Sequence, residues 1–238
     1  MRVLGRRMPA EQIANKWDIG FVSEDMRLYD SMTVGWHMHF IQSIYANWDA
    51  AYARLLLKRL GLRAEQKING LSHGQRVKAA LLLALARKPK LLVLDEPTTG
   101  LDPVARHEIL RELTGIMADE GRCVLFSSHQ TQDVEQISDE ITFIDRGRFI
   151  DSMDKELYLD RWRRLRLEVP LRIELPALPG IISVRQEGRL TVATANAFVP
   201  DLANAYENTG ARIQRIESMT LEEIFVANVE HSREEVEA

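Results

Sequence analysis

The sequence predicts an α/β protein with a mostly parallel sheet and a helical subdomain, followed by a small C-terminal α+β appendage. Apolar runs alternate with helical segments between residues 91 and 144, which is typical of parallel strands joined by crossover helices. An aromatic-rich helical stretch comes before them, and short alternating strands dominate after residue 155. We therefore expect one domain over residues 1–154 and a second over residues 155–238.

The composition indicates an ordinary globular chain. Of its 238 residues 45% are hydrophobic and 28% are charged, and the net charge of -4 offers no broad basic surface for DNA or RNA. The longest apolar run, residues 79–86, is far shorter than the roughly 20 residues of a membrane-spanning helix. We expect no nucleic-acid partner, and any membrane role to depend on another protein.

The first half of the chain predicts a strand and three helical segments. A strand is expected over residues 18–22, followed by a polar turn. Two apolar faces at helical spacing lie within residues 35–60 and are joined near residues 47–49. A further helix is expected over residues 74–86, where a basic last turn precedes Pro89.

The alternating part of the chain follows. The single cysteine, Cys123, lies in an apolar run that we expect to be a buried strand, and one cysteine excludes an internal disulfide. The appendage predicts a hairpin turn at Glu187-Gly188. We expect strands over residues 91–94, 123–127, 141–144 and 149–150, and helices over residues 104–119, 131–137, 198–208 and 221–229.

Two adjacent carboxylates, Asp95 and Glu96, follow the predicted strand 91–94. Open α/β sheets bind ligands at the carboxyl ends of their strands. In phosphoryl transfer one carboxylate can hold Mg²⁺ while its neighbour polarises the attacking water. The simpler alternative is a strand followed by an acidic turn.

Three other positions have a structural and a functional interpretation. Ser72 can cap a helix and expose backbone N–H groups to an anion such as a γ-phosphate, and the two roles are compatible. Asp102 can cap the next helix or reach across a subunit interface. His129 lies beside Asp95 and Glu96 if strands 91–94 and 123–127 are neighbours.

In this order the segments resemble the ATP-binding-cassette (ABC) ATPase family, whose fold is of the P-loop NTPase type. Four motifs carry the resemblance: LSHGQ at residues 71–75 resembles the signature, LLVLDEP at 91–97 the Walker B strand, TGLDP at 99–103 the D-loop, and SSH at 127–129 the switch-histidine region. The resemblance extends from about Gly5 to Ile150, and the tail resembles the C-terminal extension of many such subunits.

The resemblance implies ATP and Mg²⁺ as ligands. Asp95 would bind Mg²⁺, Glu96 would act as the base and His129 would hold the γ-phosphate. Asp102 would signal across a dimer of two nucleotide-binding domains. The signature residues that would contact the γ-phosphate of the ATP held by the partner domain are Ser72, Gly74 and Gln75.

The resemblance also implies partners and a location. The chain would pair with a second nucleotide-binding domain, as a homo- or heterodimer, and with an integral-membrane permease, against which the helical layer at residues 29–60 would press. It would lie in the cytoplasm, on the inner face of the cell membrane. The features around Trp48-Asp49 and the extension favour exporter-type systems. The alternatives are a soluble ABC protein without a permease and a non-catalytic fragment.

Two residues depart from the family pattern. Glu24 stands where the Q-loop has glutamine, and it could still approach Mg²⁺ through an oxygen or a water. His73 stands where the signature usually has glycine, and its side chain must point away from the nucleotide or add a titratable donor near it.

A phosphate-binding loop needs Gly-x-x-x-x-Gly-Lys-Ser/Thr, but no Gly-Lys pair occurs in these 238 residues. Arg2-Val3-Leu4-Gly5 resembles the strand and turn that follow this loop's helix, so we expect the sequence to begin inside the domain, through a misplaced start or a truncated gene, with degenerate evolution as the third alternative. We predict no ATP hydrolysis by the chain as written.

Overall fold

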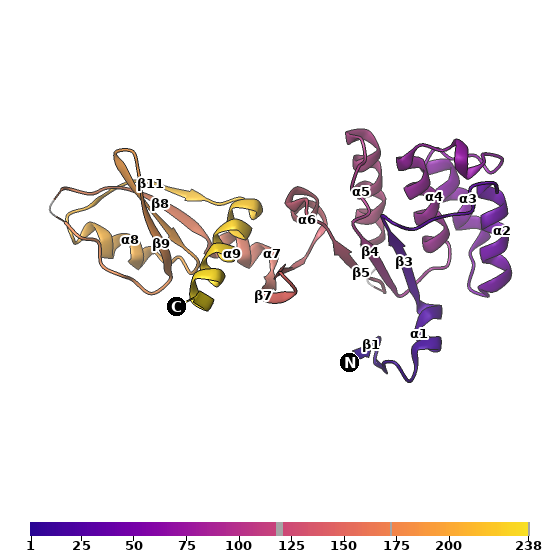
Figure 1. The fold of residues 1–238 in the computed structure, drawn as a ribbon, viewed down its shortest axis with the longest axis horizontal. Coiled ribbons are helices and arrows are strands. Elements are labelled where there is room, and N and C mark those ends of the chain that lie inside the picture. Colours follow the sequence, from indigo (N-terminus) through magenta and orange to yellow (C-terminus); the bar gives the residue numbers. More distant parts are fainter. Residues whose placement is uncertain (118–120, 172, 238) are drawn as a thin grey trace. The chain divides into compact units, whose positions relative to one another are not determined.

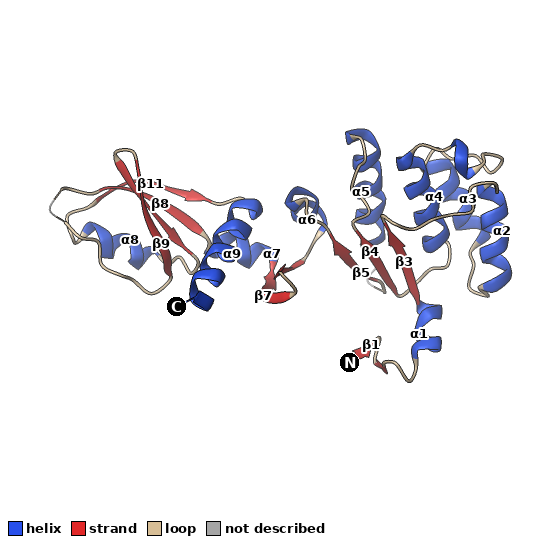
Figure 2. Cartoon of the chain, in the orientation of Figure 1, coloured by secondary structure: helices blue, strands red, loops and turns tan. Residues whose placement is uncertain are grey.

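The computed structural model describes residues 1–117, 121–171 and 173–237. The chain forms two compact units, Met1–Ile137 and a second that begins at Ser138. Figure 1 shows the order of the elements, and Figure 2 distinguishes helices from strands. No helix in the described residues combines the length and the apolar character needed to cross a bilayer.

A parallel three-stranded sheet organises the first unit. Its order is β3 (Ile19–Ser23), β4 (Leu91–Asp95) and β5 (Cys123–Ser127). The register places Ser23, Asp95 and Ser127 side by side at the carboxyl edge. The strands are parallel and joined by crossover connections, as the alternating sequence predicts. The polar residues at the end of each strand therefore lie at the same edge of the sheet.

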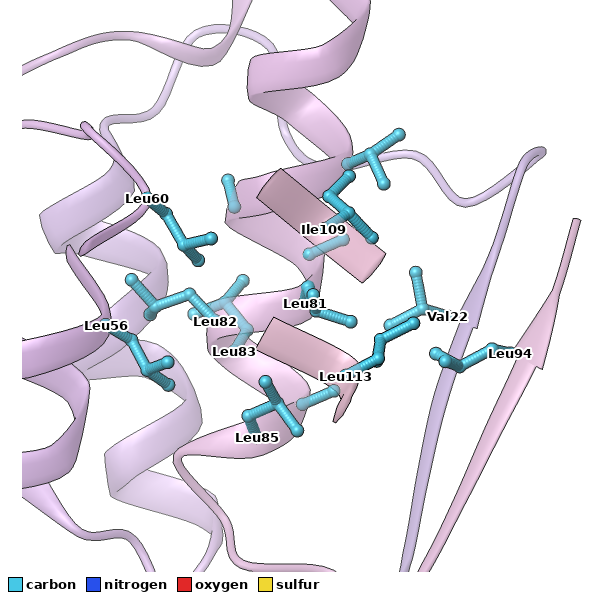
Figure 3. Close-up of a cluster of buried hydrophobic side chains, with 14 of the residues drawn as sticks. Val22, Leu56, Leu60, Leu81, Leu82, Leu83, Leu85, Leu94, Ile109 and Leu113 are labelled. Atoms are coloured by element: carbon cyan, nitrogen blue, oxygen red, sulfur yellow. The ribbon is translucent and has the colours of Figure 1, made fainter. Parts of the chain in front are cut away.

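Helices α4 (His73–Leu85) and α5 (Pro103–Met117) cover one face of this sheet. Nearly every residue of α4 is buried, as expected for a helix that is apolar on most sides. Figure 3 shows Leu81 of α4 and Leu113 of α5 directed toward Val22 and Leu94 on the strands. This packing holds the first turn of α4 beside the carboxyl edge of the sheet.

The predicted helical layer forms two helices, α2 (Val34–Ile44) and α3 (Ala50–Arg59). Thr33 caps α2 and Asp49 caps α3, each accepting a backbone N–H of the first turn. Bonds from Lys88 and the Tyr52 backbone N–H lower the pKa of the Asp49 carboxyl. A short 3₁₀ turn, η1 (Ile68–Gly70), leads into α4.

Smaller elements complete the first unit. Strands β1 (Arg2–Val3) and β2 (Arg6–Arg7) form a hairpin, α1 (Gln12–Asp18) precedes β3, and α6 (Thr131–Ile137) follows β5. A hydrogen bond from Arg6, 2.8 Å long, lowers the pKa of the Asp18 carboxyl at the end of α1. The sequence analysis did not predict α1.

The second unit begins with the antiparallel hairpin β6 (Glu140–Asp145) and β7 (Arg148–Asp154), followed by α7 (Lys155–Arg161). The elements that follow are β8 (Arg163–Glu168), β9 (Ile181–Glu187), β10 (Leu190–Ala195), α8 (Pro200–Glu207), β11 (Arg212–Ser218) and α9 (Leu221–Glu237). The strands form a four-stranded antiparallel sheet in the order β11-β8-β10-β9. Helix α8 covers one face of this sheet, where Leu165, Ala193 and Tyr206 pack together.

The structure differs from the sequence analysis at Cys123. Cys123 is exposed, so the prediction of a buried cysteine is wrong; β5 is an edge strand among the described residues. The β6–β7 hairpin packs with α7 and α9 in the compact unit that begins at Ser138. The predicted end of the helix 104–119 lies outside the described residues.

Candidate functional site

The carboxyl edge of the parallel sheet holds the acidic pair. Asp95 is the last residue of β4 and is exposed. The Ser127 hydroxyl, on the neighbouring strand, donates to Asp95 Oδ1 at 2.6 Å. The Glu96 backbone N–H donates to the Ser127 carbonyl at 3.2 Å. The bond from Ser127 orients the Asp95 carboxylate through Oδ1.

Glu96 and His129 form the centre of the site. The two side chains meet at 2.8 Å, between Glu96 Oε2 and His129 Nδ1. This contact confirms that strands β4 and β5 are neighbours and bring these residues together. The side chain of His129 is 66% exposed and that of Glu96 is 27% exposed, so the pair opens to solvent.

The backbone at Glu96 is left-handed, with φ of +51°. Residues other than glycine adopt this conformation only where surrounding contacts hold them in it. One such contact comes from Thr99, whose hydroxyl donates to Glu96 Oε2 at 2.8 Å. Another is the bond from the Glu96 N–H to the Ser127 carbonyl.

The signature segment forms the start of α4. Ser72 Oγ accepts from the Gln75 backbone N–H at 3.2 Å, and Gln75 Oε1 accepts from the Ser72 N–H at 3.0 Å. This reciprocal capping box is the structural role that the sequence allowed for Ser72. It also holds the first turn of the helix in place.

Gly74 is buried at the contact between α4 and the D-loop side of α5. A Cβ added there would lie 3.1 Å from the Cβ of Ala105. Close packing therefore accounts for glycine at this position. The sequence analysis had considered only contact with nucleotide.

Asp102 caps α5. Its Oδ1 accepts from the backbone N–H groups of Val104 and Ala105, each at 3.0 Å. This is the simpler of the two roles that the sequence analysis weighed.

Glu24 follows β3 and lies next to the acidic pair through its backbone, since its N–H donates to the Asp95 carbonyl at 3.1 Å. Its side chain is exposed and lines a cavity of about 410 Å³ together with His73 and Arg76. No group of three or more His, Cys, Asp or Glu suited to a metal occurs in the described part of the chain. Glu24 and Asp95 are thus joined through the backbone at the carboxyl edge of the sheet.

Sequence reasoning missed several polar residues that support the site. Thr99 and Ser127 hold the two carboxylates directly. Deeper in the unit, the buried Thr98 hydroxyl donates to Asp133 at 2.6 Å, and Arg106 pairs with the same carboxylate. The signal available was the position of Ser127, the last residue of a strand predicted to lie beside the strand that ends near Asp95.

The second face of the parallel sheet is apolar but exposed. Phe21 is 51% exposed and Leu125 is 61% exposed, and both side chains belong to the register row Phe21-Val93-Leu125. Within the described residues β5 pairs only with β4, so its outer edge has no strand beside it. The acidic pair therefore lies at the edge of a sheet that is covered on one face.

Comparisons with known proteins agree with this arrangement. Residues 3–99 match a family model described as "ABC transporter". The chain is 29% identical over 168 residues to the ABC transporter ATP-binding protein YtrB of Bacillus subtilis, covering 69% of this chain and 58% of the relative. It is 32% identical over 153 residues to the Nod factor export ATP-binding protein I of Neorhizobium galegae, covering 62% and 44%. The chain thus spans about half the length of these curated relatives.

A solved structure shares the fold. It is a dimeric ATP-binding cassette in a post-hydrolysis state with ADP and phosphate bound, with a TM-score of 0.55, 23% sequence identity, and coverage of 63% of this chain and 69% of that one. The parallel sheet and its acidic edge define an α/β fold of the P-loop NTPase class. Residues 3–99 thus match the ABC transporter family model, and the chain is similar to ATP-binding proteins of that family.

Proposed function

We propose that this chain is the ATP-binding and ATP-hydrolysing subunit of an ABC transporter that drives a separate permease in the direction of export. The observation that supports it best is the Glu96–His129 contact at 2.8 Å beside the exposed Asp95. We assign residues 1–154 to a partial nucleotide-binding domain and the remainder to a C-terminal extension. The export named for the Neorhizobium relative favours the direction.

In hydrolysis Glu96 and His129 have different roles. Glu96 accepts a proton from the attacking water, and its solvent-facing position leaves room for that water. His129, held by Glu96 through Nδ1, presents its other ring nitrogen to the γ-phosphate of ATP. These roles need a base and a phosphate ligand within one site, and the contact between the two side chains provides that proximity.

Mg²⁺ fits the edge of the sheet through Asp95. This metal is usually bound by one or two carboxylates together with water and substrate phosphates, so a single exposed carboxylate suits it. When bound, Mg²⁺ neutralises charge on the phosphates. Ser127 orients Asp95 for that role, and Glu24, whose backbone N–H donates to the Asp95 carbonyl, would act through a water.

The phosphate-binding loop comes from residues other than these 238, either in the same gene product or in another chain. In the part of the chain that the structure describes, the outer edge of β5 has no partner strand and the row of Phe21 and Leu125 is exposed; a strand and a helix placed there would complete the sheet, which supports this. We propose that the 238 residues by themselves do not hydrolyse ATP.

Two such domains work head to tail. Ser72, Gly74 and Gln75 of one domain face the γ-phosphate of the ATP bound to the other, and Asp102 lies at the interface. The capped first turn of α4 suits an anion, since its free N–H groups and helix dipole attract negative charge. The dimeric ADP-bound relative supports this assembly.

The permease contacts an exposed aromatic stripe on α2. Trp36, Phe40 and Ile44 follow one another at intervals of four residues and are 38%, 41% and 44% exposed. The rings of Trp36 and Phe40 stack at 5.2 Å, and Tyr29 packs edge-on against Trp36. Exposed aromatic groups of this kind mark protein contacts more often than free surface.

The catalytic assignment is tested by phosphate release from two proteins, the 238-residue chain and the same chain extended upstream by its own gene. We expect hydrolysis only in the extended protein, where Glu96→Gln lowers kcat by roughly 10² or more because the base is lost. Glu112→Gln is the control, since Glu112 pairs with Arg59 away from the site. Turnover by the 238-residue chain that depends on Glu96 would end the inactivity proposal, and full activity of Glu96→Gln in the extended protein would end the role of the base.

The permease assignment is tested by the fraction of the protein that sediments with membranes from cells of its own source. Replacing Trp36 and Phe40 by alanine is expected to lower that fraction more than about tenfold, because truncating an aromatic anchor costs about 2 kcal/mol or more. Val104→Ala, at a 68% exposed position on α5, is the control. Equal binding by the aromatic variant and the control would rule out this surface.

A further inference from the structure

His73 is the first residue of α4 and lies beside the loop that carries Glu96. Its imidazole Nε2 lies 3.1 Å from the carbonyl oxygen of Thr99. Because a carbonyl only accepts, Nε2 carries the proton in this contact. The ring also rests on the backbone of Gly100, where a Cβ would lie 3.6 Å from Nε2. The residue that departs from the usual signature thus contacts the D-loop of its own chain.

The Thr99 residue extends this contact to Glu96. Its backbone N–H donates to the Glu96 carbonyl at 3.3 Å, and its hydroxyl donates to Glu96 Oε2 at 2.8 Å. The same Oε2 meets His129 Nδ1. A continuous set of hydrogen bonds therefore runs from the first turn of α4, through Thr99, to the carboxylate and its histidine.

The contact is separate from the capping of α4. The capping box uses the side chains of Ser72 and Gln75, and the His73 side chain takes no part in it. A change at His73 therefore removes the contact with Thr99 while the cap remains. Helix capping alone does not account for the direction of the imidazole.

We propose that His73 is a positioning residue that fixes the Glu96 carboxylate through Thr99 and thereby links the signature turn to the catalytic base of the same chain. The proposal rests on the proposed function for the meaning of Glu96 as a base. The contact matters because the backbone at Glu96 is left-handed, and a strained residue keeps such a conformation only while its neighbours hold it. In the proposed dimer, the turn that contacts one ATP would thus help set the base for the other.

The test uses the 238-residue chain without nucleotide and compares His73→Ala with His73→Gln. We expect His73→Ala to speed amide exchange at Thr99 and Leu101 roughly five- to tenfold, the effect of losing one hydrogen bond of about 1 kcal/mol. It should also shift the ring ¹⁵N signals of His129, which does not touch His73. Glutamine can place an N–H donor at a similar reach, so His73→Gln should stay close to the unchanged protein in both measurements.

Two further variants make the result specific. His107→Ala, at an exposed histidine on α5, should leave both measurements unchanged. Thr99→Val keeps the backbone carbonyl but removes the hydroxyl, and it should shift the His129 signals even if His73→Ala fails to fold.

Two results would overturn the proposal. One is unchanged His129 signals in Thr99→Val. The other is faster exchange in His73→Ala without a change at His129, because His73 would then hold only the loop backbone. Since no nucleotide is present, neither result depends on whether the chain hydrolyses ATP, and a failure of the ATPase proposal would leave the link intact.

Discussion

The two sheets of this chain differ in the polarity of their second face. In the antiparallel sheet β11-β8-β10-β9, Leu165 packs toward α8, while the opposite face carries arginines paired with glutamates. In the parallel sheet β3-β4-β5 both faces are apolar, but Phe21 and Leu125 on the second face are largely exposed. The arginines of the antiparallel sheet that form these pairs are Arg164, Arg166 and Arg185.

The comparison shows which sheet carries polar residues on its second face and which carries apolar ones. Antiparallel sheets commonly place polar residues on a solvated face, whereas parallel sheets are normally buried on both faces and are apolar throughout. The second face of the antiparallel sheet is polar, as in the first pattern, but it is partly covered: Val192 and Thr194 are 4% and 7% exposed, and α9 supplies the glutamates that pair with Arg164 and Arg185. The parallel sheet has the composition of the second, so its exposed face is suited to a covering element.

The largest expected effect separates the two faces of the parallel sheet. Leu94 is 1% exposed on the packed face and Leu125 is 61% exposed on the other. We expect Leu94→Ala to lower the free energy of unfolding by about 2 to 5 kcal/mol, because it removes buried methyl groups and leaves a cavity. Leu125→Ala should cost less than about 1 kcal/mol. Urea unfolding of the two variants measures this, and equal losses would show that both faces are packed.

An intermediate effect is expected at Cys123, which lies on the exposed face at the edge strand. The thiol should react with a maleimide in the folded chain at a rate within about tenfold of that in the unfolded chain, because access controls the reaction. Labelling followed by mass spectrometry gives the rate. Slow labelling that speeds only on unfolding would mean that this face is covered. In a protein that includes the phosphate-binding loop we expect protection of the same thiol.

The smallest effect concerns the polar face of the antiparallel sheet. Hydrogen bonds from the Thr220 backbone N–H and from Arg164 hold the pKa of the Glu223 carboxyl on α9 below its ordinary value of 4.5. A lowered folded-state pKa gives stability that is present above pH 4.5 and is lost as the pH falls through the folded-state pKa. Glu223→Gln should therefore lose less stability between pH 5 and pH 3 than the unchanged protein.

The control for this measurement is Glu222→Gln at the neighbouring position of α9. It should keep the acid sensitivity of the unchanged protein. If the two variants respond alike to acid, the bonds from Thr220 and Arg164 do not hold the carboxylate in solution.

Much of the fold could be predicted because its signals are local. The apolar run that forms β4 and the capped, apolar α4 lie within two residues of their expected bounds, since periodicity and helix caps are set by neighbouring residues. The contact of Glu96 with His129 also followed once two strands were taken as neighbours. The exposure of Cys123 did not follow, because a strand's burial depends on what lies beside it rather than on its own composition.

The support of the site could not be predicted for a related reason. Thr99 reaches Glu96 across a turn, and Ser127 reaches Asp95 across two strands, so their bonds depend on side-chain directions that no spacing defines. The close packing of Gly74 on Ala105 joins two helices 31 positions apart.

Because the backbone of Glu96 is left-handed, stability of the fold favours glycine at this position, whereas the proposed hydrolysis requires a carboxylate. Glycine would adopt φ of +51° without the strain of about 1 to 3 kcal/mol that a side chain brings there. Glu96→Gly is therefore one of the few substitutions in this chain that should make it more stable while removing its proposed base. A glutamate that persists at such a position among descendants of this gene would be a sign that selection still acts on hydrolysis, and its drift to glycine or asparagine would be an early sign that the activity has been abandoned.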